Sequence, residues 1–282
     1  MNPRPPHRLR GRRAALALTI AGSDSGGGAG LQADLKTFAA LGVHGTCVVT
    51  CVTAQNPCSV RSVRACATTL VEAQLTALLD ELPPAAAKTG MLLAPDIIHA
   101  VVRLLAGRRF PLVVDPVMVA TSGAVLLRPS AVRALRDQLL PLATLATPNL
   151  DEAGILVGTR LETPEDLRAA AREIHRQSGC AVLVKGGHLP ACREAVDIFY
   201  DGRRELLLSA PFIRHVSTHG TGCTYSAAIT GWLARGLPLP AAVRAAKAFV
   251  TQAIAASVRI GRHQALNPLA RRAPDLTKSA IP

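Results

Sequence analysis

The chain passes from the apolar run Ala14-Ala15-Leu16-Ala17-Leu18-Thr19-Ile20-Ala21 directly into the loop Gly22-Ser23-Asp24-Ser25-Gly26-Gly27-Gly28-Ala29-Gly30. A helical pattern follows from Gly30 to Leu41 and is closed by Gly42. The apolar run has the length of a buried strand, and the glycines mark the turn that joins it to the helix. A strand followed by a helix is the first half of a βαβ unit.

The same order recurs along the chain. Further strands are predicted at Cys47–Val52, Ala85–Lys88, Leu112–Asp115, Leu142–Thr147 and Ala181–Val184. Helices are predicted at Thr69–Leu82, Pro95–Ala106, Pro129–Leu140 and Pro164–Ser178. Thr69 and Glu72 have the spacing of a capping box, Thr163 is expected to cap its helix, and Gly179 to end it. The repeat predicts an α/β fold with a mainly parallel central sheet and helices on both faces.

The second half departs from this order. Val196–Tyr200 and Glu205–Leu208 flank Asp201-Gly202, which predicts a β-hairpin. Helices are then expected at Thr224–Ala234 and Pro240–Val258, the latter ending at Gly261. We expect one domain over residues 14–261 and a frayed tail over 262–282.

Composition narrows the class of protein. Of 282 residues, 49% are hydrophobic and 18% charged, which indicates a compact globular protein, and the apolar runs are too short to predict a membrane span. Met1–Arg13 holds five arginines, three prolines and no acid, so we expect a disordered basic arm. Seven cysteines without a C-x-x-C pair favour reduced thiols in the cytoplasm. The net charge of +13 does not predict nucleic-acid binding, because aromatic residues make up only 3% and the arginines are scattered.

The glycine-rich loop stands where a doubly wound sheet binds its ligands, beyond the carboxyl end of a strand. It has neither the Lys of a Walker loop nor the spacing G-x-G-x-x-G. A flexible turn is therefore an equal alternative on the glycines alone. Asp24 in the loop and Asp34 one turn into the helix favour a site that holds a ligand hydroxyl.

Charged residues also follow later strands. Asp115 and Glu152 are candidates to organise Mg²⁺ with nucleotide phosphates, because a charge after a buried strand needs a cation. The structural alternative is helix capping by Asn149 or Asp151. Lys185, before Gly186-Gly187, is placed to contact a phosphate or else is a solvated strand end.

A second glycine turn, His219-Gly220-Thr221-Gly222-Cys223-Thr224, opens a long apolar helix. Its backbone N–H groups and the helix dipole together suit a phosphoryl group in transit, and the dipole should lower the pKa of the Cys223 thiol. A buried cysteine in a tight turn is the alternative.

Taken together, these motifs resemble those of the hydroxymethylpyrimidine/phosphomethylpyrimidine kinases, a ribokinase-like family of thiamine biosynthesis. The matching segments are Ile20–Thr37, Thr53-Ala54-Gln55-Asn56, Lys88-Thr89-Gly90-Met91-Leu92, Asp115-Pro116-Val117-Met118, Thr147-Pro148-Asn149, Val184–His188 and His219–Thr224, in the family's order. The resemblance covers about residues 14–258. It departs at Pro57, where a Thr is more usual, and at Thr121–Ala124, which lacks the family's usual acid.

The resemblance implies two ATP-dependent phosphorylations, first of 4-amino-5-hydroxymethyl-2-methylpyrimidine and then of its monophosphate. Gln55 resembles the residue that hydrogen-bonds the aminopyrimidine, with Asp34, Ala29, Met91 and Val117 around it. Asn149, Lys185 and Lys247 resemble nucleotide contacts, and Asp115 and Glu152 the Mg²⁺ support. By the same resemblance, Gly220, Thr221 and Gly222 are expected to form the transfer site, and Cys223 stands where most ribokinase-like enzymes have a catalytic Asp.

Other functions remain open at this stage. A pyridoxal/pyridoxine kinase would share the fold and the phosphate apparatus, and Gln55 does not exclude pyridoxine. A catalytically silent vitamin-binding regulator and a nucleic-acid-binding protein built on the basic arm are less compatible with the glycine turn, Asp115 and Lys185. We expect small-molecule substrates, no nucleic-acid or membrane partner, and a homodimer.

Overall fold

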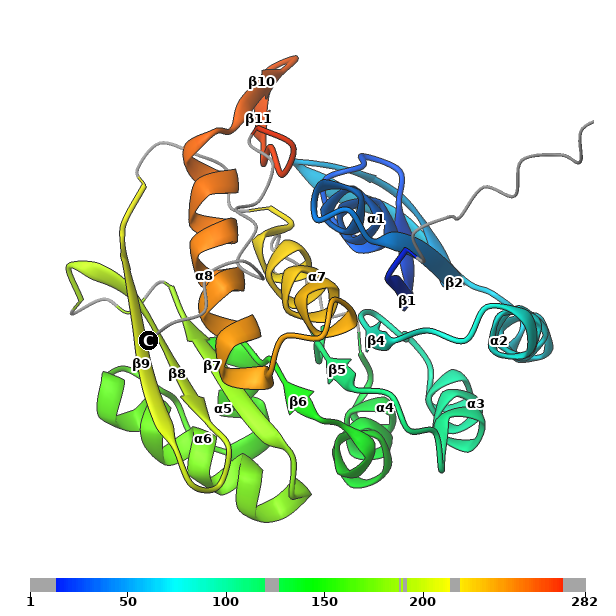
Figure 1. Ribbon diagram of the computed structural model, residues 1–282, viewed down its shortest axis with the longest axis horizontal. Coiled ribbons are helices and arrows are strands. Elements are labelled where there is room, and N and C mark those ends of the chain that lie inside the picture. The colour runs from blue at the N-terminus through cyan, green and yellow to red at the C-terminus, as the bar shows by residue number, and fades with distance from the viewer. Residues whose placement is uncertain (1–13, 120–126, 188, 190–191, 214–218, 271–282) are drawn as a thin grey trace, which may run out of the picture.

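The computed structural model describes residues 14–119, 127–187, 189, 192–213 and 219–270, and within them nine strands form one central sheet. The strand order is β3-β2-β1-β4-β5-β6-β7-β8-β9 (Figure 1). The basic arm, the segment Thr121–Ala124 and the last part of the predicted tail, 271–282, lie outside the described residues. No helix in the described ranges is long and apolar enough to cross a membrane.

The central strands run parallel: β1 (Leu16–Asp24), β2 (His44–Asn56), β4 (Ala86–Thr89), β5 (Leu112–Val114), β6 (Leu145–Ala146) and β7 (Ala181–Gly186). The antiparallel strands are β3 (Ser59–Ala65), β8 (Glu194–Tyr200) and β9 (Glu205–Pro211). The mainly parallel sheet is therefore confirmed, as is the hairpin at Asp201-Gly202, where Gly202 has a φ of 88°.

Helices cover both faces of the sheet (Figure 1). One face carries α1 (Gly30–Ala40), α7 (Thr221–Ala234) and α8 (Leu239–Ala255), whose apolar residues form one core around Phe38 and Trp232. The other carries α2 (Thr68–Glu81), α3 (Pro95–Leu105), α4 (Pro129–Ala134), α5 (Leu150–Val157) and α6 (Pro164–Ser178), with a second core around Leu75, Ile98 and Leu167.

The strand order reverses at β1, which pairs with β2 on one side and β4 on the other. The helices that follow these two central strands cover opposite faces, because α1, after β1, belongs to one core and α3, after β4, to the other. A doubly wound sheet binds its ligands beyond the carboxyl ends of the strands at such a point. A ligand site is therefore expected among the loops after β1, β4 and β5.

The helix boundaries confirm some predicted signals and contradict others. Thr163 and Asp166 form a capping box at the start of α6, and Gly179 ends it with a φ of 75°. The capping box predicted at Thr69 and Glu72 is wrong, because α2 begins at Thr68 after Ala67 and has no side-chain cap. The predicted helix Pro129–Leu140 continues past α4 as a π turn, Leu135–Leu139, and a 3-10 turn, Leu140–Leu142.

The prediction was also wrong at the C-terminal end. Helix α8 ends at Ala255, and a small hairpin follows, made of β10 (Val258–Ile260) and β11 (His263–Ala265). Gly261, with a φ of 55°, forms the hairpin turn and does not end a helix. The first residues of the predicted frayed tail are thus paired in a hairpin.

Candidate active site

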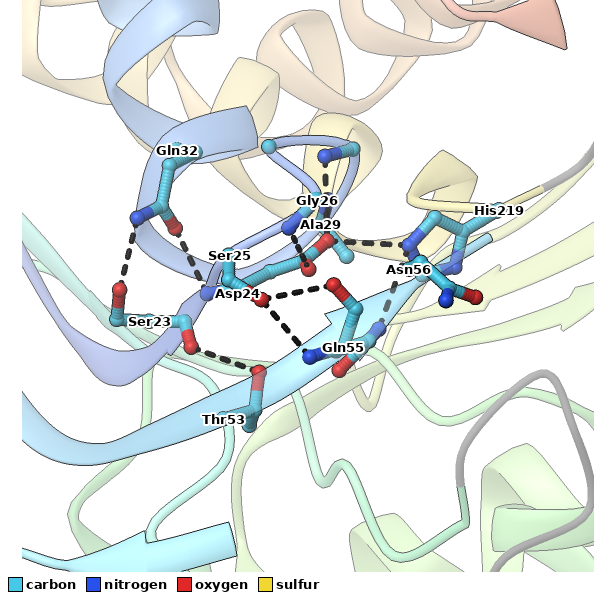
Figure 2. Close-up of polar contacts among 12 residues, drawn as sticks. Ser23, Asp24, Ser25, Gly26, Ala29, Gln32, Thr53, Gln55, Asn56 and His219 are labelled. Atoms are coloured by element: carbon cyan, nitrogen blue, oxygen red, sulfur yellow. Dashed lines mark hydrogen bonds and ion pairs between the residues drawn. The ribbon is translucent and has the colours of Figure 1, made fainter. Parts of the chain in front are cut away.

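The Asp24 carboxylate organises the glycine-rich loop after β1 (Figure 2). Its Oδ1 accepts a hydrogen bond from Gly26 N–H at 2.8 Å, and its Oδ2 accepts from Gly28 and Ala29 N–H at 3.1 and 2.9 Å. His219 Nε2 lies 3.1 Å from the same Oδ2. Burial opposes ionisation of Asp24, but the bonds from His219 and the backbone outweigh it and hold the pKa of this carboxyl below its ordinary value.

Hydrogen bonds join the same loop to the end of β2 and so fix Gln55. Ser25 Oγ donates to Gln55 O at 2.7 Å and accepts from Gln55 N at 2.8 Å. Thr53 Oγ1 donates to Ser23 O at 3.0 Å, and Gln32 bonds both Ser23 and Asp24. The Gln55 side chain is half-buried, with its Nε2 at 3.5 Å from His219 Nε2. Figure 2 shows Gln55 and His219 turned toward each other above β2.

Three residues predicted to line the substrate site lie at the carboxyl ends of neighbouring strands. Ala29, Met91 and Val117 follow β1, β4 and β5, and each is partly exposed. Met91 Cε approaches Gly22 so closely that a Cβ on that glycine would lie 2.8 Å away. Met91 thus lies beside the start of the glycine-rich loop, of which Ala29 is a part.

Asp34 lies deeper than the sequence suggested. Its carboxylate is fully buried and accepts hydrogen bonds from Thr19 Oγ1 at 2.6 Å and Lys88 Nζ at 2.8 Å. Burial raises the pKa of Asp34, although Lys88 opposes that shift. The predicted contact between Asp34 and a substrate stays a prediction.

A second charged group gathers around Asp115, just after β5. Asp115 accepts from Lys185 Nζ at 2.9 Å, from Thr147 Oγ1 at 3.2 Å and from Ser226 Oγ at 3.0 Å. Despite burial, the charges of Lys185 and Lys88 hold the pKa of Asp115 below its ordinary value. The structure thus brings together Asp115 and Lys185, which the sequence placed at separate strand ends.

Glu152 takes part in a capping box at the start of α5, and its predicted role in a Mg²⁺ site stays a prediction. Its carboxylate accepts from Asn149 N–H at 2.9 Å, and Asn149 Oδ1 accepts from Glu152 N–H at 2.9 Å, which confirms capping by Asn149. Burial, together with the Asp115 charge, raises the pKa of the Glu152 carboxyl to about 7. Such a carboxyl gains from a nearby cation.

The turn before α7 packs against the glycine-rich loop. Gly220 has a φ of 81°, and a Cβ there would lie 1.8 Å from Gly28 O, so the position requires glycine. A Cβ on Gly222 would lie 3.3 Å from Lys185 Nζ and 4.0 Å from Asp115 Oδ2. Thr221 Oγ1 is buried without a hydrogen-bond partner in the described part of the chain. A buried hydroxyl without a partner suits a ligand oxygen.

The expected low pKa of Cys223 is wrong. Burial raises the pKa of this thiol to about 11, although the Lys88 charge and a hydrogen bond from Gly30 N–H act in the opposite direction. The helix start supplies N–H groups, but the protein atoms around the sulfur remove the water that would stabilise a thiolate.

Lys247 on α8 is bound by other residues of the chain. Its Nζ donates to Asp197 Oδ2 at 2.7 Å and to Ala195 O at 2.9 Å. Asp197 also accepts from Gly186 N–H at 3.1 Å, next to Lys185. The predicted contact between Lys247 and a nucleotide stays a prediction.

Solved structures of other proteins share this fold. A Bacillus subtilis pyridoxal kinase in complex with ADP matches with a TM-score of 0.83 and 39% identity, over 90% of this chain and 97% of that one. A phosphomethylpyrimidine kinase from Clostridium difficile matches with a TM-score of 0.76 and 41% identity, over 85% and 99%. The fold and site define a ribokinase-like kinase.

The sequence comparisons give the family. The family model described as phosphomethylpyrimidine kinase matches residues 24–268. A hydroxymethylpyrimidine/phosphomethylpyrimidine kinase from Synechococcus elongatus is 50% identical over 249 residues, which cover 88% of this chain and 95% of that protein. The chain belongs to the phosphomethylpyrimidine kinase family.

Proposed function

We propose that this chain transfers the γ-phosphoryl group of ATP to the hydroxyl of 4-amino-5-hydroxymethyl-2-methylpyrimidine and then to the resulting monophosphate, in thiamine biosynthesis. One observation supports this proposal most. Lys185, Asp115 and the Gly220-Thr221-Gly222 turn lie close together, next to the loop that fixes Gln55. Phosphoryl transfer depends mainly on positioning and on charge around the transferred group, which this arrangement provides.

Gln55 and the apolar side chains of Ala29, Met91 and Val117 hold the pyrimidine. A primary amide presents an acceptor and a donor side by side, which matches an amino group next to a ring nitrogen. Asp34 supports this pocket from behind through Thr19 and Lys88.

Lys185 neutralises the nucleotide phosphates, with Asn149 beside them and Lys247 held near the same strand end by Asp197. The backbone N–H groups of Gly220, Thr221 and Gly222 stabilise the charge on the transferred phosphoryl group. Cys223, the next residue, lies where the acceptor oxygen attacks, and it is the proposed base for the alcohol.

Asp115 and Glu152 would hold Mg²⁺. The donor set fits, because Mg²⁺ in nucleotide sites is bound by one or two carboxylates together with phosphate oxygens and water. The metal supplies positive charge to the phosphates when bound. A cation bound there would favour the ionised form of Glu152, whose pKa is raised by burial and by the Asp115 charge.

The proposed enzyme is a single kinase domain over residues 14–261, a cytoplasmic homodimer. Seven cysteines without a disulfide among the described residues suit a reducing compartment. Sedimentation of the purified chain measures the oligomeric state.

A coupled assay of ADP release tests the function. With the pyrimidine alcohol as limiting substrate, we expect two equivalents of ADP per alcohol, and one equivalent from the monophosphate. A pyridoxal kinase is the second candidate, because the Bacillus subtilis pyridoxal kinase has the TM-score of 0.83 given above. Faster initial turnover of pyridoxal than of the pyrimidine alcohol would assign the chain to that activity instead.

A further inference from the structure

One ring nitrogen of His219 faces two partners at once. His219 Nε2 lies 3.1 Å from Asp24 Oδ2 and 3.5 Å from Gln55 Nε2 (Figure 2). The His219 ring packs on Gly28, where a Cβ would lie 2.8 Å from His219 Cδ2. The three polar side chains therefore meet between the glycine-rich loop and the turn that begins at Gly220.

The Asp24 carboxylate determines that His219 Nε2 carries the proton of the hydrogen bond between them. This carboxylate already accepts from Gly26, Gly28 and Ala29, and its lowered pKa keeps it ionised at neutral pH. An ionised carboxylate can only accept, so His219 Nε2 must donate to it. A ring nitrogen that carries a proton has no lone pair left to accept a second one.

Because His219 Nε2 is a donor, the Gln55 amide must turn its oxygen, and not its NH₂ group, toward it. Its NH₂ group cannot donate to His219 Nε2, whereas its oxygen can share the His219 N–H with Asp24. An amide is oriented by its hydrogen bonds, and turning its oxygen toward His219 directs its NH₂ group away from the Gly220 turn.

The amide orientation sets the direction of a bound ring. In the aminopyrimidine, ring N3, the C4 amino group and the C5 hydroxymethyl group follow one another along one edge. An amide that reads N3 and the amino group donates to N3 and accepts from the amino group. The hydroxymethyl group then lies beyond the amide oxygen, on the side of His219 and Gly220. The reversed amide would direct the hydroxyl away from that turn.

We propose that His219 is a positioning residue, which fixes the Gln55 amide oxygen on the side of the Gly220-Thr221-Gly222 turn and so directs the pyrimidine hydroxymethyl group toward the transferred phosphoryl group. This inference rests on the function proposed above. It assigns His219 a part in substrate orientation through Gln55, separate from the backbone groups of the turn that follows it.

The test compares His219→Leu with His219→Gln, whose amide NH₂ can reach the place of Nε2. In His219→Leu, kcat for the pyrimidine alcohol should fall about twofold, because without the hydrogen bond that favours one orientation of the Gln55 amide the two orientations become equally populated and half of the bound alcohol is misdirected. The Kd of the alcohol without nucleotide and the KM for ATP should each change by less than about threefold, because the ring still finds Gln55 in either orientation. His219→Gln should recover most of kcat. The matched control is His99→Leu, which removes an exposed histidine whose Nε2 lies 3.4 Å from Gln138 Nε2, away from the site.

A double-variant cycle separates this role from an effect on the turn. In a Gln55→Leu background, adding His219→Leu should leave kcat unchanged, because the amide through which His219 acts is gone. A further loss of twofold or more would overturn the proposal and assign His219 to the phosphoryl site. Wild-type turnover of the alcohol is measured in the same series, and its absence would refute the proposed function itself.

Discussion

Replacing Lys88 by Met tests whether the buried pair beneath the site stabilises the fold as the structure requires. Lys88 and Asp34 are 2.8 Å apart, and neither side chain has exposed surface. Methionine keeps much of the length and apolar body of lysine but leaves Asp34 with Thr19 as its remaining hydrogen-bond partner in the described part of the chain. Breaking a buried pair on one side costs about 3–5 kcal/mol, because an uncompensated charge stays in the interior.

Urea unfolding at pH 7 measures this cost. With an m-value of about 3 kcal/mol per molar, the midpoint should fall by roughly 1–1.7 M. Lys88→Met combined with Asp34→Asn removes the stranded charge as well, so it should recover a large part of the loss. Arg136→Met, which breaks the exposed pair with Asp137, is the control and should leave the midpoint unchanged.

The same variant should show a distinct pH dependence. Burial raises the pKa of Asp34 and Lys88 opposes that rise, so removing Lys88 moves the folded-state pKa further above the unfolded value. The stability of such a group is present below the unfolded pKa and lost as pH rises through the folded pKa. The gap between wild type and Lys88→Met should therefore narrow as pH falls from 7 toward 4. Equal midpoints at pH 7, or a gap that widens on acidification, would refute the reasoning.

Three further substitutions test the parts of the site. Gln55→Leu should raise KM for the pyrimidine alcohol and leave KM for ATP unchanged, because the polar edge of the pyrimidine loses its hydrogen-bond partner, at a cost of roughly 1–3 kcal/mol. An unchanged pyrimidine KM would show that Gln55 is not part of the pocket. Lys185→Met should weaken ATP binding and lower kcat together, while calorimetry without nucleotide shows pyrimidine affinity retained; intact ATP affinity would make Lys185 a structural partner of Asp115 only. Gly220→Ala should abolish transfer to both acceptors, because the added Cβ would lie 1.8 Å from Gly28 O. The control is Gly236→Ala: Gly236 has a similar φ of 87° but no atom within 4 Å of an added Cβ, so the turnover of this variant should match wild type.

Most of the sheet could be predicted because its strands are buried on both faces and so read as continuous apolar runs, as at Leu112–Val114. Strand β3 was missed because it lies at the sheet edge, where Arg61 and Arg64 face solvent and give no apolar run. The hairpin after α8 was missed because Gly261 suits a helix end and a tight turn equally.

In the site, the sequence predicted the residues that follow strands and missed those whose role depends on distant partners. Lys88 lies within a buried strand and is explained only by Asp34, 54 positions earlier. His219 was included in the glycine turn without a role, because its contacts to Asp24 and Gln55 join positions 195 and 164 residues apart. A charge inside an apolar strand was the one signal in the sequence that marked Lys88.

Because the pKa of Cys223 is raised, the proposed role of this thiol as a base can be tested by its pH dependence. A thiol with a pKa of about 11 is protonated at neutral pH, so a base role draws on a small thiolate fraction. The alcohol must lose a proton as it attacks, whereas the monophosphate presents an oxygen that is already anionic.

If Cys223 is the base, kcat for the alcohol should rise by about tenfold per pH unit between 7 and 9, following the thiolate fraction, while kcat for the monophosphate stays nearly flat. Cys223→Ala should then remove the rise and slow the first transfer more than the second, and Cys66→Ala, a cysteine partly buried elsewhere, should change neither. Losses of equal size on the two acceptors, with no change in pH profile, would contradict the base role, because both transfers use the same backbone N–H groups of the turn.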